Sequence, residues 1–151
     1  MNTVLLEELT WTEVEAAVED GVRTAIVPVG STEQHGPHLP LGTDAYIGEA
    51  IAERVAERLG DALVAPCIRP GVSGHHMEFP GTVSIDADVL MDLLSGYAES
   101  LERHGFEYVV FLPSHGGNFA PVETAAPEIA RGGEPGDVSR PADRDRLLGL
   151  V

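Results

Sequence analysis

The segment VGSTEQHGPHLPLGTD, residues 29–44, contains four side chains that could bind a metal ion, namely Glu33, His35, His38 and Asp44. Glu33 and His35 are separated by one residue, so in extended backbone their side chains point to the same side. A carboxylate oxygen beside an imidazole nitrogen suits Zn²⁺, Mn²⁺, Fe²⁺ or Co²⁺ and differs from the thiolate set of a structural zinc site. The segment therefore predicts part of a metal site.

The elements that position these residues alternate between strands and helices. Compact apolar runs predict buried strands at residues 23–30, 62–68 and 107–113. Helical periodicity predicts helices at residues 11–20, 44–59, 86–104 and 118–131. This alternation is typical of βαβ units and predicts an α/β layered fold with a parallel sheet.

Ligands of parallel α/β sheets bind beyond the carboxyl ends of the strands. Glu33 and His35 follow the first predicted strand, whereas His115 follows the third, in the sequence SHGGN. Asp44 begins the helix after the first strand. We therefore expect Glu33, His35, Asp44 and His115 to converge, and a carboxylate that bridges would suit two metal ions activating one water.

Each of these residues also has a simpler interpretation. Glu33 could cap or pair on the surface, Asp44 could cap its helix, and His38 and His75 could be loop residues near the site. His104, at a helix end, would complement the helix dipole. A fold with no metal therefore stays open, but G-x-S-x-G, G-x-G-x-x-G and P-loop sequences are absent.

Side-chain patterns predict how the helices are capped and which faces they bury. Thr10 and Glu13 have the spacing of a capping box, and Asp86 or Asp88 is expected to cap the third long helix. The apolar residues at helical spacing, expected to pack inward, are Ile47, Ile51, Val55 and Leu59 in the second helix and Val89, Leu93, Leu94, Tyr97 and Leu101 in the third.

The chain carries 25 acidic and nine basic residues, a formal net charge of −16, and every basic residue is Arg. Such a surface repels phosphate backbones and anionic membranes, so we expect no nucleic-acid and no membrane partner. The acidic side chains also repel one another, and a high salt concentration screens this repulsion. The composition therefore suggests a halophilic source. Thermal melts should then show stabilisation in molar KCl, and equal melting temperatures at low and high KCl would contradict this hypothesis.

The length of 151 residues predicts one domain. A single cysteine, Cys67, allows no intrachain disulfide and is expected to be a small buried residue. No apolar run approaches the roughly 18 residues of a membrane span. We expect a cytoplasmic protein.

Three motifs in order, GSTEQHGPHLPLGTD, HHMEFPGTVSI and PSHGGN, resemble those of the creatininase family of metal-dependent amidohydrolases, over residues 4–131. The resemblance implies a three-layer α/β/α fold with a mostly parallel sheet and a homo-oligomer, usually a hexamer. It also implies a site with two divalent ions, such as Zn, Mn or Fe, whose bridging water attacks the carbonyl of a small-molecule amide substrate.

The resemblance also assigns roles to individual residues. Glu33 matches a ligand of the first metal, His35 a ligand of the second, Asp44 the bridging carboxylate and His115 a further ligand of the first metal. His76, which precedes the FPGT sequence, matches a segment near the active site and is expected to orient substrate or a ligand.

The chain departs from the family pattern at position 117 and in its tail. Creatininase has a Glu ligand two residues after the last His, whereas this chain has Gly117 there. The branch with H-G-G-N resembles one that takes this carboxylate from a glycine-rich stretch in its C-terminal half. Residues 1–131 are expected to form a partial creatininase-like domain and residues 132–151 a poorly ordered tail, the composition change at Gly132 suggesting a truncated or frameshifted product.

The function that follows is hydrolysis of a non-peptide C–N bond. A cyclic amide such as creatinine and a formamide such as a formamidopyrimidine nucleotide are the two expected substrate types, and cleavage of a peptide precursor is the third possibility within the family. The alternative is a catalytically inactive truncated remnant that retains a partial metal site.

Overall fold

Three parallel strands form the sheet in the computed structural model of this protein, which describes residues 2–131. The predicted tail, residues 132–151, lies outside the described residues. The strands are β1 (Thr24–Val29), β2 (Ala62–Val64) and β3 (Tyr108–Pro113), in the spatial order β2-β1-β3. The predicted α/β fold with a parallel sheet is therefore confirmed.

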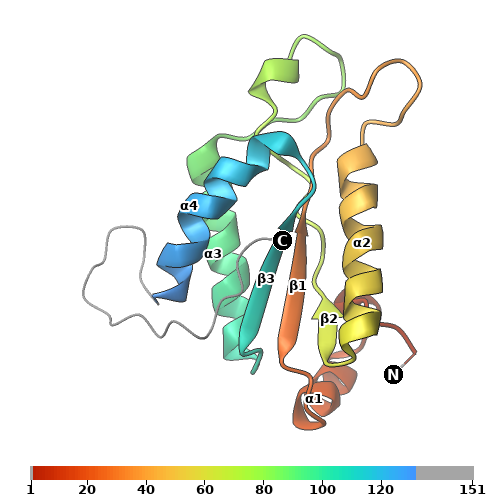
Figure 1. The fold of residues 1–151 in the computed structure, drawn as a ribbon, viewed down its shortest axis with the longest axis vertical. Helices are drawn as coiled ribbons and strands as arrows, with labels where there is room; N and C mark the ends of the chain where they lie inside the picture. Colours follow the sequence, from red (N-terminus) through yellow and green to blue (C-terminus); the bar gives the residue numbers. More distant parts are fainter. Residues whose placement is uncertain (1, 132–151) are drawn as a thin grey trace.

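Helices cover both faces of this sheet and create three layers (Figure 1). The helix α2 (Thr43–Leu59) packs on one face, while α3 (Ala87–Arg103) and α4 (Phe119–Ala130) pack on the other. The helix α1 (Trp11–Glu19) lies near the amino ends of the strands. Short 3₁₀ turns complete the described chain: η1 (Leu6–Glu8), η2 (Gly74–His76) and η3 (Gly116–Asn118).

The central strand β1 is buried along its whole length because helices cover both of its faces. Its alternate residues enter two separate apolar clusters, Val27 with α3 and α4, and Ile26 with α2. The neighbouring strand β2 is shorter than predicted, since Pro66 has no N–H to donate to a sheet ladder. The chain rejoins β1 at Ile68, whose N–H donates to Pro28 O at 2.9 Å.

Helix capping differs between the two predicted caps. The capping box of α1 is confirmed: Thr10 N–H donates to Glu13 Oε2 at 2.8 Å, and the Thr10 hydroxyl accepts from Glu13 N–H at 3.4 Å. Asp86 stands at the N-cap position of α3 but its side chain makes no cap hydrogen bond, so a capping role for that carboxylate is wrong. The dipole still favours its charge near the helix start.

The predicted buried face of α2 is wrong. The four larger apolar residues remain 39–54% exposed, whereas the residues that face the sheet include Ala45, Gly48, Ala52 and Ala56. A Cβ at Gly48 would lie 2.6 Å from Ser114 Oγ, which shows how closely the helix backbone approaches the sheet. Small side chains permit this close approach of the helix to the sheet. The larger residues consequently lie on the exposed side of the helix, namely Ile47, Ile51, Val55 and Leu59.

The buried face of α3 is rotated from the predicted one. Leu94 and Leu101 are buried as expected, and Tyr97 packs against the core while partly buried. Val89 and Leu93 are 46% and 37% exposed, so their predicted burial is wrong. The positions that replace them in the core are Leu90 and Ala98.

Cys67 is half-buried and lies in the connection that follows β2. Burial raises the pKa of its thiol to about 11, so the thiol stays protonated at neutral pH. Among the described residues, no helix combines the length and apolar character that a membrane crossing requires.

Candidate metal centre

The predicted ligands follow the carboxyl ends of β1 and β3 in the chain. These strand ends lie at the upper side of the sheet in Figure 1. Residues 30–42 leave β1 and return to α2, and residues 114–118 leave β3 and lead into α4. A third loop, residues 69–86, brings η2 to the same end of the molecule. Segments far apart in sequence therefore meet at this edge.

The loop after β1 folds back on itself and places Asp44 beside Glu33. Glu33 N–H donates to Leu41 O at 2.9 Å, and His35 pairs with Leu39 in an antiparallel bridge. Gly30 allows the strand end to pass close to α2, since a Cβ there would lie 2.7 Å from the Cα of the residue after Asp44. Glycine at the end of β1 thus allows the strand backbone to lie close to the backbone of α2.

Four predicted ligands converge in this space. His35 Nε2 lies 3.0 Å from Asp44 Oδ1, and His115 Nδ1 lies 3.1 Å from Asp44 Oδ2 and 3.3 Å from Glu33 Oε1. Glu33, Asp44 and His115 are only 4–7% exposed. The four predicted ligands therefore lie close together, as expected. The Asp44 side chain points to both His rings and makes no capping hydrogen bond to α2.

Backbone carbonyls determine how the two His rings are oriented. His115 Nε2 lies 3.1 Å from Val72 O, and His35 Nδ1 lies 3.2 Å from Glu33 O. A carbonyl oxygen only accepts, so each of these nitrogens carries the hydrogen and donates it. In the neutral rings the lone pairs of His115 Nδ1 and His35 Nε2 then face carboxylate oxygens, an arrangement that a cation between them would stabilise.

The carboxylates also present oxygens that no hydrogen bond satisfies. Within residues 2–131, Glu33 Oε2 and Asp44 Oδ2 are buried without a hydrogen-bond partner, and the contact of Asp44 Oδ2 with His115 lacks hydrogen-bond geometry. Buried charged oxygens are costly unless they are paired or coordinate a metal. The donor set therefore fits a divalent cation.

His76 lies at the edge of the same cluster. Its Nε2 is 3.8 Å from Glu33 Oε1, and Gln34 Nε2 donates to its Nδ1 at 3.0 Å. The Gln34 amide is fixed in this orientation because its Oε1 accepts a hydrogen bond from Gly36 N–H at 3.0 Å. In the neutral His76 ring, Nε2 then keeps the hydrogen and can donate it to a bound molecule.

The two histidines assigned to loops lie in different places. His38 is exposed and belongs to neither cluster of metal-binding side chains found in the described chain. Those clusters are Glu33 with His35 and Asp44, and Glu33 with His75 and His115. His75 was therefore missed as a candidate ligand, and only the doubled HH sequence before FPGT could have indicated it.

Buried polar residues behind the centre were also missed. Ser73 Oγ lies 2.6 Å from Ser31 Oγ and 3.3 Å from His115 Nε2. Asn118 is fully buried, donates to Val29 O and Gly30 O, and accepts from the N–H of the residue before Ser73 at 3.0 Å. These residues join the three loops, and no local sequence signal reveals such long-range bonds.

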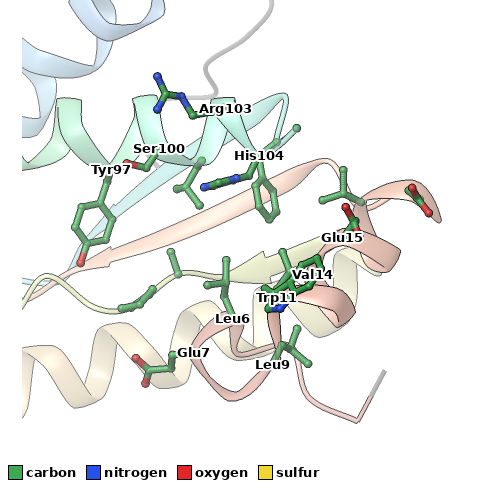
Figure 2. Close-up of a pocket in the computed structure, with 17 residues that line it drawn as sticks. Leu6, Glu7, Leu9, Trp11, Val14, Glu15, Tyr97, Ser100, Arg103 and His104 are labelled. Carbon is green, nitrogen blue, oxygen red and sulfur yellow. The ribbon is translucent and has the colours of Figure 1, made fainter.

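A hollow of about 980 Å³ lies elsewhere, between η1, α1 and the C-terminal part of α3 (Figure 2). Apolar residues such as Leu6, Trp11 and Val14 line it, with His104 on the opposite wall. None of the clustered Glu, Asp and His residues of the candidate centre lines this hollow. Its position at the amino ends of the strands separates it from the candidate centre.

The family model described as creatinine amidohydrolase matches residues 7–146. This chain belongs to the creatininase family. The mycofactocin precursor peptide peptidase of Mycolicibacterium smegmatis is 48% identical over 114 residues, which cover 72% of this chain and 44% of that protein. The creatinine amidohydrolase of Pseudomonas putida is 39% identical over 119 residues, covering 76% of this chain and 45% of that protein.

Solved creatininase structures share this fold. The crystal structure of creatinine amidohydrolase matches with a TM-score of 0.79 and 32% identity, over 99% of this chain and 58% of that one. Two related creatininase structures are described as a Zn-Zn type and as Mn. The chain thus spans about half the length of the relatives that it matches, and the predicted family membership is confirmed.

Proposed function

We propose that this creatininase-family protein is a metal-dependent amidohydrolase whose ions are held by Glu33, His35, Asp44 and His115. The observation that carries the proposal is a pair of buried carboxylates, each with one oxygen that lacks a hydrogen bond. Beside them lie two oriented His rings, whose nitrogens face Glu33 Oε1 and both Asp44 oxygens. Family relatives described as hydrolases and structures described as Zn-Zn and Mn support it.

Two divalent ions, when bound, would polarise an amide carbonyl and lower the pKa of a shared water. The chain's own contribution is to fix the ligands before substrate arrives. The Val72 carbonyl orients His115, and the Glu33 carbonyl orients His35. Such backbone partners fix the tautomer of each ring and hold its other nitrogen toward the ion.

His76 is proposed to orient the substrate. Gln34 holds the ring so that Nε2 can donate to an oxygen or nitrogen of a bound amide near Glu33. A donor placed where negative charge develops stabilises the transition state. This role requires His76 to contact the substrate and gives it no part in binding the ions.

The proposed substrate has a non-peptide C–N bond, as in a cyclic amide such as creatinine or in a formamide. A second candidate is cleavage of a peptide, favoured by the 48% identical relative described as a mycofactocin precursor peptide peptidase. In both reactions an activated water would attack an amide carbonyl carbon, so the same arrangement of side chains suits either substrate.

Hydrolysis assays with creatinine, a formamide and a short peptide amide, each with added Mn²⁺ or Zn²⁺, test the proposal. We expect turnover of at least one compound and a loss of roughly 100-fold or more in His35→Ala, which lacks a ligand. The matched control His104→Ala changes a His outside the cluster and should keep full activity. No turnover by a chain that binds metal would support a catalytically inactive metal-binding protein instead.

A further inference from the structure

We propose that His75 is an additional protein ligand of the ion that Glu33 and His115 would hold, an inference that rests on the proposed metal-dependent function. One ligand atom from each of Glu33, His75 and His115 lies within 4.8 Å of the other two. The His75 and His115 rings lie nearly parallel, at an interplanar angle of 4° and a centroid distance of 6.0 Å. The two rings thus lie side by side, with a Glu33 oxygen near one nitrogen of each.

The turn that follows β3 offers no other side chain for this position. A Cβ at Gly117 would lie 2.1 Å from Val72 O and 2.6 Å from His115 Nε2. Any larger residue would displace the carbonyl that orients His115. Position 117, where the creatininase pattern has a Glu ligand, therefore stays glycine in this backbone, and a ligand in its place would come from another loop.

The free nitrogens of His75 set it apart from the other histidines of the centre. His35, His76 and His115 each have a ring nitrogen hydrogen-bonded to another protein group. Across residues 2–131, the structure shows ring contacts for His75 and no hydrogen bond to its ring. Its exposed position on η2 leaves either nitrogen available to an ion.

With His75, two groups of three side chains could each hold an ion, and Asp44, which lies 3.0 Å from His35 and 3.1 Å from His115, could bridge them. One set is Glu33, His75 and His115, and the other is Glu33, His35 and Asp44. Three protein ligands with one open position are typical of catalytic zinc sites. Glu33 belongs to both groups, and its Oε1 lies 3.3 Å from His115 Nδ1 and 3.8 Å from His76 Nε2.

Titration of the metal-free chain with Zn²⁺, followed by calorimetry and by metal content after dialysis, tests the proposal. We expect two ions per chain in the wild type and a weakening of one site by roughly tenfold or more in His75→Ala, since even outer partners of metal ligands are worth that much. His75→Glu, which supplies another ligand atom, should restore much of the lost affinity. His104→Ala should titrate as the wild type does.

The outcomes separate this inference from the proposed function. If His75→Ala binds both ions with wild-type affinity, the His75 assignment is overturned, and Glu33, Asp44 and His115 hold that ion without it. If the wild type itself binds no Zn²⁺, the proposed function fails along with the assignment. A loss in His75→Ala that His75→Glu does not repair would also contradict direct ligation.

Discussion

Replacing Glu33 by Gln is expected to weaken Zn²⁺ or Mn²⁺ binding by roughly 100-fold or more and to stabilise the metal-free protein. Glu33 belongs to both clusters of metal-binding side chains in the described part of the chain, so its loss affects both ions. A direct ligand should contribute more than the 10- to 100-fold typical of its outer partners. Calorimetric titration of the variant measures this change.

The metal-free protein should respond in the opposite direction. Without an ion, Glu33 and Asp44 place carboxylates within 4.8 Å of each other in a buried site, and neutral Gln removes this repulsion. A gain of about 1 kcal/mol would raise the melting temperature in EDTA by about 2–4 °C for a domain of this size. Asp44→Asn is the matched variant, and its melting temperature in EDTA should rise as that of Glu33→Gln does.

A lower melting temperature of Glu33→Gln in EDTA would contradict this interpretation. It would mean that Glu33 stabilises the fold through ion pairs with protonated His76 and His115. Two carboxylates and two imidazolium rings could then balance their charges without any metal. The direction of the shift therefore distinguishes a metal site from a structural salt-bridge network.

Replacing Asn118 by Leu is expected to lower the free energy of unfolding by about 3 kcal/mol or more. The Asn118 amide pairs with three backbone groups, the carbonyls of Val29 and Gly30 and the N–H of Val72. A leucine of similar size would leave those groups buried and unpaired, at about 1–3 kcal/mol each. Chemical denaturation followed by circular dichroism measures the loss.

The effect should extend to metal binding, since Asn118 holds the segment whose Val72 carbonyl orients His115. Thr124→Ala is the matched control on α4, because its exposed hydroxyl bonds only within the helix, to Ala120 O. Its stability should change by less than about 0.5 kcal/mol. An Asn118→Leu variant within about 1 kcal/mol of the wild type would show that the three loops are held by other contacts.

The sequence predicted the candidate centre better than it predicted the helix faces. Glu33, His35 and His115 could be placed because strand ends in a parallel sheet meet at one edge, which is a property of topology. The buried face of α2 could not be predicted from the sequence. Close packing of Ala52 and Ala56 on the sheet outweighs the helical pattern of the larger apolar residues. Contacts between distant segments decide this, and periodicity within one helix does not report them.

The same reason explains the residues that were missed. His75 becomes a candidate ligand only when η2 is brought beside β3, and the role of Asn118 depends on partners 46 to 89 residues away. The structure of a single chain does not bear on its oligomeric state or its location in the cell. The predicted homo-oligomer, the cytoplasmic location and the halophilic source stay predictions.

The most direct measurement is an anomalous difference map from crystals of the full chain grown with Zn²⁺, recorded on both sides of the zinc absorption edge. The proposed metal-dependent function predicts strong zinc density enclosed by Glu33, His35, Asp44 and His115 at the carboxyl ends of β1 and β3. An ordered cluster with no anomalous density, its carboxylates paired directly with the His rings, would contradict it.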